Sequence, residues 1–247
     1  VERGVPDFVV PFVRGSAFWP ARTFARRLWG IGSEAQNQLS ESGAADCLPY
    51  YSDLTRFDRG SEGYAPDGVL RFLYAGRYSF RKGFDTLIAA IEELRSSGST
   101  AKWTVSLCGD GDLKPLLAEK PELADRVSDL GFQELAEVPA VMKRHDVFVT
   151  PSRYDGWGMV VPEALAAGMP VIATHSMGSA QDISGNPACL KRVEAGNAQA
   201  LAQAMQWFVE NKSRIPELGK EATQVSGNYD SVAGAQRFAA LVDEALS

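Results

Sequence analysis

The feature that most constrains the fold of this chain is a regular alternation of short apolar runs and amphipathic segments between residues 69 and 174. Strands are predicted at 69–75, which is largely apolar, and at 103–108, 127–130, 146–150 and 170–174. The segment 82–94 carries apolar residues at helical spacing, namely Phe84, Leu87, Ile88, Ile91 and Leu94. Strands that alternate with helices in this way predict an α/β fold with a Rossmann-like parallel sheet sandwiched by helices.

The other helices are predicted from shorter patterns. One is expected near residues 135–142, with Leu135, Val138, Val141 and Met142 facing the core, and another over 160–168. Three helical segments at about 197–211, 214–225 and 230–246 close the chain.

The first part of the chain has a different character. A short helix through Ala35 and Leu39 is expected there, with Ser33 as its N-cap. Residues 49–68 have no apolar period and are dense in Gly, Pro and Asp, which is typical of a linker. We therefore expect three regions: residues 1–48, a linker over 49–68, and a main domain over 69–247.

Charge and cysteine content exclude several classes of protein. The net charge of −6 argues against a nucleic-acid-binding protein, because such proteins carry a basic footprint. The three cysteines are far apart and lack metal-ligand spacing, which predicts free thiols in a reducing compartment and no metal site. No apolar stretch is long enough to span a bilayer and no secretory signal is evident, so we expect a cytoplasmic protein.

A basic and aromatic segment runs from Arg14 to Trp29, where arginines alternate with Phe and Trp side chains. A helix of this composition can lie on a membrane surface. It can equally pack between two domains with its aromatic rings buried. Peripheral membrane contact through Arg14–Trp29 is therefore one of two interpretations.

Ligands of open parallel sheets bind at the carboxyl ends of the strands, so the loops there hold the candidate site. The first such loop begins with Gly76 and Arg77 and ends with Lys82 and Gly83. Its glycines permit close backbone approach, and Arg77 and Lys82 suit a diphosphate beside a helix N-terminus. A solvated basic loop explains the same residues.

The second loop contains Gly109 and Gly111 and superficially resembles the dinucleotide fingerprint Gly-x-Gly-x-x-Gly. Lys114 occupies the place of the third glycine. Asp110 and Asp112 also disfavour a pyrophosphate in this loop. A tight turn is the simpler interpretation.

The third loop follows the strand that ends at Thr150 and leads directly into a helix. Gly156 and Gly158 leave room for a sugar or phosphate against bare backbone amides. Glu163, near the start of the helix, can direct a carboxylate at ribose hydroxyls. A first-turn acid that is favoured only by the helix dipole is the alternative for Glu163.

Taken in order, these motifs resemble a known family. The matching elements are Gly76-Arg77, Lys82-Gly83, Gly109-x-Gly111, Gly131, Pro151-Ser152 and Asp155-x7-Glu163. They are similar to the donor-binding domain of the retaining glycosyltransferases of family 4, which have the GT-B fold. The resemblance implies that residues 69–247 form the C-terminal half of a GT-B fold, which binds a nucleotide sugar. It also implies that residues 1–48 are the tail end of the N-terminal acceptor domain.

The resemblance implies a role at each matching position. Arg77 and Lys82 would bind the donor diphosphate and stabilise the leaving group, while Asp155 would approach the transferred sugar; these three are the expected catalytic residues. The expected donor-binding residues are Gly76, Gly131, Phe132, Gly156, Trp157, Gly158, Met159 and Glu163. Gly131 and Phe132 would lie beside the nucleobase and Glu163 would bind the ribose. The donor would be a UDP- or GDP-sugar, with no further cofactor and no metal, and the acceptor a carbohydrate or a lipid-linked sugar.

The sequence departs from the family pattern in two places. Asp155 is one methylene shorter than the usual Glu. The usual Gly-Gly-x-x-Glu motif after the last strand is replaced by the segment 177–182, Met-Gly-Ser-Ala-Gln-Asp. Both departures weaken the expected contacts at those positions.

The expected function is transfer of a sugar with retained anomeric configuration in glycan, polysaccharide or glycolipid synthesis. A non-catalytic nucleotide-sugar-binding subunit and a nucleotide-sugar epimerase are the alternatives, and Gly109–Gly111 alone suggests a nicotinamide-dependent oxidoreductase. Residues 1–48 are too few for an acceptor domain, so this chain alone is expected to bind donor but to transfer sugar poorly. Of the two histidines, we expect His145 at the surface and consider His175 a candidate ligand contact.

Overall fold

The structure is a computed structural model that describes residues 27–41, 44–60, 68–98, 100–183 and 185–247. It divides into two compact units: residues 50–234 form the larger one, and residues 1–49 with 235–247 form the smaller one. Most of the Arg14–Trp29 segment lies outside the described residues, and so does its expected contact with a membrane. Among the described residues, no helix is long and apolar enough to cross a membrane.

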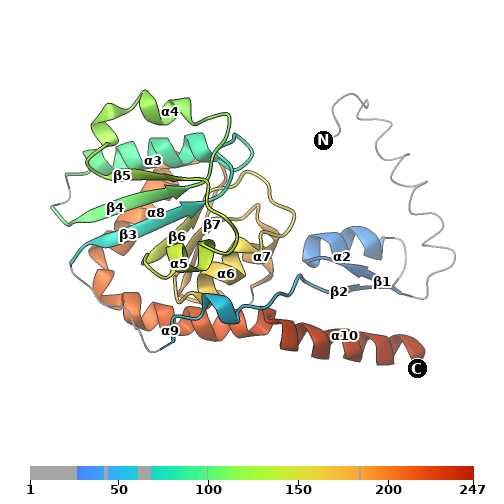
Figure 1. Ribbon diagram of the computed structural model, residues 1–247. Helices are drawn as coiled ribbons and strands as arrows, with labels where there is room; N and C mark the ends of the chain where they lie inside the picture. Colours follow the sequence, from blue (N-terminus) through green and yellow to red (C-terminus); the bar gives the residue numbers. More distant parts are fainter. Residues whose placement is uncertain (1–26, 42–43, 61–67, 99, 184) are drawn as a thin grey trace, which may run out of the picture. The chain divides into compact units, whose positions relative to one another are not determined.

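The larger unit is built on one six-stranded sheet of order β5-β4-β3-β6-β7-β8, shown in Figure 1. All neighbouring strands run parallel. The strands are β3 (Leu70–Ala75), β4 (Trp103–Cys108), β5 (Val127–Gly131), β6 (Val147–Thr150), β7 (Val171–Thr174) and β8 (Leu190–Val193). The parallel α/β fold predicted from the sequence is confirmed. Strand β8 was not predicted, because Lys191 and Arg192 interrupt its apolar pattern.

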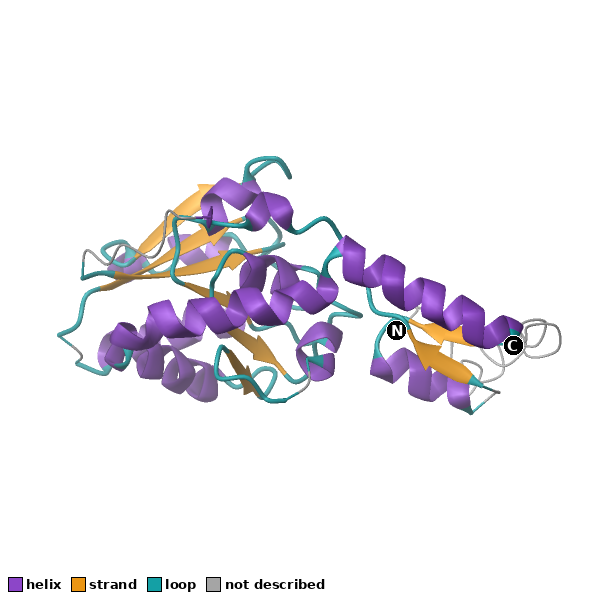
Figure 2. Ribbon diagram, turned by 90° about the horizontal axis from the view of Figure 1, so that it is seen from below, coloured by secondary structure: helices purple, strands orange, loops and turns teal. Residues whose placement is uncertain are grey.

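Helices connect these strands and cover the sheet. They are α3 (Phe84–Ser96), α4 (Pro115–Ala118), α5 (Val138–Met142), α6 (Val160–Ala166), α7 (Gly178–Asp182), α8 (Ala198–Glu210) and α9 (Ile215–Ser226), with the short 3-10 helices η1 (Thr55–Phe57), η3 (Pro121–Leu123), η4 (Lys212–Arg214) and η5 (Gly227–Tyr229). The β3-α3-β4 and β6-α6-β7 connections proceed in opposite directions along the sheet. Since such crossovers are right-handed, α3 and α6 lie on opposite faces. Helix α3 packs against α8, and α6 against α9; Figure 2 shows the helices from below.

The core lies on both faces of the sheet. Every residue of β6 and β7 is buried, as expected of central strands covered on both sides. The apolar stripe predicted on α3 is buried in full. For the helix predicted near 135–142, the expectation that Leu135 faces the core is wrong. Leu135 is exposed, and the helix begins only at Val138.

Residues before the sheet also contribute to this core. Leu54 and Phe57, within the segment expected to be a linker, are buried. Leu54 precedes the 3-10 helix η1 and Phe57 is its last residue. This helix contacts α5 and α6. The part of the expected linker at 61–67 lies outside the described residues.

The smaller unit contains a parallel pair of short strands, β1 (Leu28–Gly30) and β2 (Ala45–Cys47), joined through α2 (Ser33–Ser40). Helix α10 (Ser231–Leu246) begins in the larger unit and continues into the smaller one from residue 235. The prediction of Ser33 as an N-cap is wrong: Gly32 precedes the helix, at φ 87°, and no side chain caps it.

Candidate functional site

The loops after β3 and β6 meet at the centre of the sheet. These two strands are neighbours in the sheet. The next strand after β3 is β4 and the next after β6 is β7, and β4 and β7 lie on opposite sides of the β3–β6 pair. Such a change of direction opens a crevice at the carboxyl ends of the strands, where parallel α/β proteins bind their ligands. The loop at 76–83 forms one side of this switch point, and the loop at 151–159 forms the other.

Gly83 brings the two loops into direct contact. It occupies the left-handed region at φ 68° and is the N-cap of α3. A Cβ atom at this position would overlap the carbonyl oxygen of Pro151. Glycine is therefore required here both for the backbone conformation and for the close approach.

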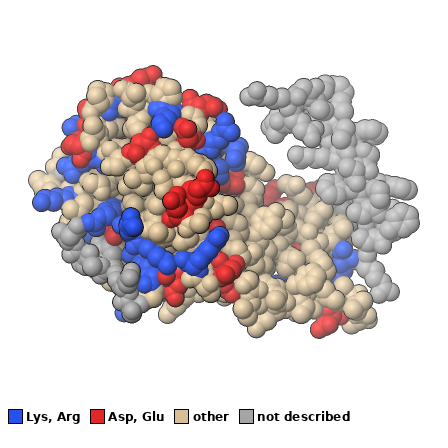
Figure 3. Space-filling model, in the orientation of Figure 1, with Lys and Arg blue, Asp and Glu red and all other residues tan. Residues whose placement is uncertain are grey.

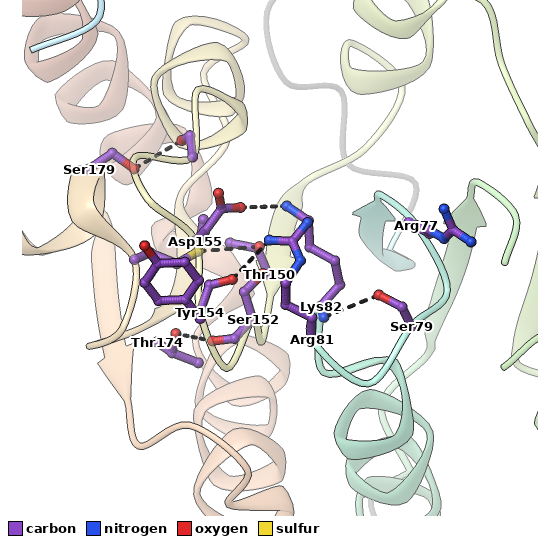
Figure 4. A network of polar contacts seen from close by, with 12 residues as sticks. Arg77, Ser79, Arg81, Lys82, Thr150, Ser152, Tyr154, Asp155, Thr174 and Ser179 are labelled. Carbon is purple, nitrogen blue, oxygen red and sulfur yellow. Dashed lines mark hydrogen bonds and ion pairs between the residues drawn. The ribbon is translucent and has the colours of Figure 1, made fainter. Parts of the chain in front are cut away.

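Lys82 and Asp155 face one another across the switch point and form an ion pair, which Figure 4 shows. Their side chains are 21% and 16% exposed, respectively. The backbone around Asp155 is held by the loop after β7, because the amide of Gly178 donates to the Asp155 carbonyl at 3.3 Å. Two of the three predicted catalytic residues are thus brought together.

A cavity of about 570 Å³ lies at the carboxyl ends of β3, β4 and β5. Its lining comes from four parts of the chain: Ala75, Gly76 and Arg77; Cys108, Gly109, Asp110 and Gly111; Phe132, Gln133 and Val138; and Val160. Among the predicted site residues, Gly76, Arg77 and Phe132 line this cavity. The Phe132 ring is 70% exposed, so its faces are open to a ligand.

The loop after β4 has a larger part in this cavity than its sequence indicated. Cβ atoms at Gly109 and Gly111 would overlap the carbonyl oxygens of Gly76 and Tyr78. These glycines therefore let the β4 loop pack directly on the β3 loop and complete the cavity wall. The spacing Gly-x-Gly indicates such a close approach, but Asp110 and Asp112 favoured the interpretation of this loop as a simple tight turn.

The charges around the cavity are paired in the described structure. Arg77 makes an exposed ion pair with Asp112 at 3.2 Å. Lys114 lies 3.3 Å from Asp129, whose carboxylate also accepts the Tyr78 hydroxyl at 2.8 Å. Figure 3 accordingly shows basic and acidic side chains of the larger unit on the same face. A bound anion would have to draw Arg77 away from Asp112.

The glycine loop after β6 is supported by the start of helix α7. The Ser179 amide donates to the Trp157 carbonyl at 2.8 Å, and the Ser179 hydroxyl donates to the Gly158 carbonyl at 2.9 Å. Gly158 is at φ 84°, close to Met177. The Trp157 side chain is buried and packs against Tyr229, so only its backbone can face a ligand. The segment that departs from the family motif thus has a clear structural role.

Glu163 lies in the first turn of α6 and is partly buried. Burial raises its pKa from the ordinary 4.5 to about 6, and nearby Arg56 counteracts this only in part. An uncompensated carboxylate is costly to keep in such a place. A carboxyl group whose pKa is raised by desolvation is a candidate for a binding site.

Several predicted residues lie away from the cavity lining. Lys82, Asp155 and Glu163 do not line it, although Val160 of α6 does. Gly131 ends β5 at φ 67°, directly before Phe132. The roles of Gly156 and Met159 stay predictions. The prediction for His145 is wrong: it is 7% exposed, and its Nδ1–H donates to the Val141 carbonyl at 2.7 Å.

The sheet order, the glycine loops and the switch-point cavity define the class of protein: this is the fold of the GT-B glycosyltransferases. The comparison with known families agrees. The chain belongs to the family of glycosyl transferases group 1, whose profile matches residues 61–225.

Individual relatives are more distant. The chain is 29% identical to a glycogen synthase of Mycobacterium tuberculosis over 144 residues, which are 56% of this chain and 34% of that protein. Sucrose-phosphate synthase from Thermosynechococcus elongatus has a similar structure, with a TM-score of 0.78 and 23% identity over 99% of this chain and 63% of that chain. The Anabaena protein HepE, solved with UDP-glucose, has a TM-score of 0.72 and 20% identity over 91% of this chain and 65% of that one. This chain spans less than two thirds of each of these three proteins.

Proposed function

We propose that residues 68–234 bind a nucleoside-diphosphate sugar, and that the protein transfers this sugar with retained anomeric configuration. The proposed product is a glycan, polysaccharide or glycolipid. Residues 1–48 would then be the end of an acceptor domain, as the family resemblance implies. The observation that carries the proposal is the meeting of Lys82 and Asp155 at the switch point beside a glycine-lined cavity.

The chemistry of sugar transfer fits these charges. Negative charge builds on the leaving diphosphate as the glycosidic bond breaks, so fixed cations and amides beside it lower the barrier. Lys82 and Arg77 are two of the three cations on the β3 loop, and Arg77 lines the cavity. In this assignment the diphosphate takes Lys82 from Asp155, and the carboxylate is then free to accept hydroxyl groups of the transferred sugar.

The nucleoside end has its own candidate contacts. The exposed ring of Phe132 offers a surface on which a base can stack. The partly buried Glu163 carboxylate is suited to accept two ribose hydroxyls, because hydrogen bonds to an anion offset its lost hydration. The UDP-glucose bound by HepE supports a uridine nucleotide as the first ligand to test.

Thermal unfolding with a panel of UDP, GDP, ADP and their sugars tests this proposal. A ligand at 100 times its dissociation constant stabilises the native state by about 2.7 kcal/mol. That corresponds to a rise in Tm of roughly 5–10 °C for a domain of this size. If none of these nucleotides raises the Tm, the proposed function is wrong.

Retention requires a second assay, on the longest natural form of the protein with a panel of carbohydrate and lipid-linked acceptors. The product's anomeric proton coupling, measured by NMR, reports the configuration. A product of inverted configuration would contradict the proposed mechanism, even if the donor binds as expected.

A further inference from the structure

Arg153 makes an unusually complete set of contacts for a residue near the surface. Its two terminal nitrogens bind the two oxygens of Asp85, at 2.6 and 2.7 Å. The same nitrogens donate to the Phe80 carbonyl at 2.7 Å and to the Thr86 hydroxyl at 3.0 Å. Its guanidinium also lies 3.7 Å from the centre of the Phe80 ring. All of these partners belong to the loop after β3 or to the first turn of α3.

The backbones of the two loops are joined in the same region. The Arg153 amide donates to the Arg81 carbonyl at 2.9 Å, and the Arg81 side chain donates to the Tyr154 carbonyl at 3.1 Å, as Figure 4 shows for the latter pair. These bonds are reciprocal, because each loop provides one donor to the other. Together with the Arg153 side chain they form a clasp, defined here as Arg153, Asp85, Phe80, Arg81 and Tyr154.

The clasp lies directly beside the proposed site. Lys82 follows Arg81 in the chain, and Asp155 follows Tyr154. The positions of Lys82 and Asp155 are therefore set by neighbours that the clasp holds together. We propose that Arg153 is a positioning residue that keeps Lys82 in place for the donor diphosphate; this inference rests on the proposed function.

The chemistry of the clasp requires an arginine. The side chains of Arg153 and Asp85 are 24% and 32% exposed, so the contact is partly desolvated. A planar guanidinium can bind both carboxylate oxygens, a carbonyl and a hydroxyl at once, whereas the ammonium group of a lysine has a single centre. Arg153→Lys therefore keeps the charge but loses the fixed geometry.

Arg126 provides a matched control. Its guanidinium lies 5.1 Å from the Trp103 ring and donates to the Trp103 carbonyl at 3.2 Å. Like Arg153, it combines an aromatic ring, a backbone carbonyl and a neighbouring aspartate, Asp125 at 3.5 Å. It lies at the amino ends of β4 and β5, the opposite edge of the sheet from the site. A general loss of stability should therefore be common to Arg153→Lys and Arg126→Lys, whereas a loss of positioning should occur only in the former.

The first test is calorimetric titration of the full chain with UDP and, in parallel, with GDP. Because Arg153 acts through Lys82, its effect on affinity is limited by the loss of the Lys82 contact, about 10-fold to 100-fold; we expect Arg153→Lys to weaken nucleotide binding several-fold within that limit. Arg126→Lys should change the affinity by less than about twofold. In a Lys82→Ala background, Arg153→Lys should add little further loss, because its effect passes through Lys82. An unchanged affinity in Arg153→Lys, or a loss in the Lys82→Ala background as large as in the wild type, would overturn the inference.

A second readout does not depend on nucleotide binding. Brief acetylation with acetic anhydride, followed by peptide mass spectrometry, reports how accessible each lysine amine is. We expect Lys82 to be labelled several-fold faster in Arg153→Lys than in the wild type, with Lys120 as the internal reference. Equal labelling of Lys82 in both proteins contradicts its positioning by Arg153. If the wild type binds no nucleotide but Lys82 labelling rises, the proposed function fails while the positioning by Arg153 is upheld.

Discussion

The ammonium group of Lys82 forms an ion pair with the carboxylate of Asp155 between the loops that follow β3 and β6. Each group thereby neutralises the other in the absence of a ligand. A donor diphosphate would compete with Asp155 for the same ammonium group. Removing Lys82 should therefore weaken nucleotide binding, whereas removing the charge of Asp155 should strengthen it.

Lys82→Ala should weaken the binding of the preferred nucleoside diphosphate. Loss of one hydrogen bond to a charged group costs about 1.5–3 kcal/mol, which is about one to two decades in the dissociation constant. Calorimetric titration measures this change. Lys120→Ala is the matched control, because Lys120 also makes a partly exposed ion pair, with Glu92 at 2.7 Å, but is not part of the site. Equal dissociation constants for Lys82→Ala and the wild type would remove Lys82 from the site.

Asp155→Asn should have the opposite effect on the bare nucleoside diphosphate. The substitution removes the competitor for Lys82, and ion pairs in partly exposed places contribute about 0.2–1 kcal/mol. We expect UDP or GDP to bind up to about fivefold more tightly, while transfer of the sugar declines because its carboxylate partner is lost. Titration with the nucleotide, combined with a transfer assay, checks both effects. Weaker nucleotide binding in Asp155→Asn would show that the carboxylate does not compete with the ligand.

Glu163→Gln should stabilise the unliganded protein at neutral pH. The folded-state pKa of Glu163, about 6, lies above the ordinary value of 4.5. Between these values the folded protein holds a proton that the unfolded chain has lost, so stability falls as pH rises through this window. The full difference is on the order of 2 kcal/mol above pH 6. Urea unfolding at pH 4 and pH 7 should show the variant more stable than the wild type only at the higher pH.

The same variant also tests the ribose contact. If Glu163 accepts ribose hydroxyls, then Glu163→Gln should reduce the preference for a ribonucleotide over its deoxy analogue. An unchanged preference would remove Glu163 from the ribose contact, whatever its effect on stability.

Gly83→Ala should be much more destabilising than Gly98→Ala. Both glycines are in the left-handed region, at φ 68° and 73°, but a Cβ at Gly98 would meet no atom within 4 Å, whereas one at Gly83 would overlap the Pro151 carbonyl. The left-handed conformation alone costs an alanine about 1–2 kcal/mol, and overpacking adds typically 1–3 kcal/mol. Chemical denaturation measures the free energies of unfolding. Equal losses for the two variants would contradict the close approach of the two loops.

The central part of the fold was predictable because its signals are local. Strands such as β3 and β6 are predominantly apolar, and the stripe on α3 repeats at helical spacing, so each is visible within a short window. Strand β8 lacks such a run, because half of its residues are charged. Helix α7 has only five residues, too few for a period to be recognised.

The site was predictable only as a set of loops. Arg153 and Asp85 are 68 positions apart, and no local pattern indicates that their side chains meet. Leu135 and His145 were misplaced for a related reason: both lie outside α5, which spans only Val138–Met142, so helical periodicity does not determine whether they are covered. Contacts of this kind depend on the packing of segments that are distant in the sequence.

The most direct test of the account is hydrogen–deuterium exchange of the chain with and without its preferred nucleoside diphosphate. The account predicts protection of backbone amides in the loops at 75–83, 108–111, 131–133 and 155–160. The groove between α3 and α8, which Trp207 and Glu93 help to line, should be unaffected. Protection confined to that groove, or binding without protection of the loops after β3 and β6, would contradict the placement of the donor site at the switch point.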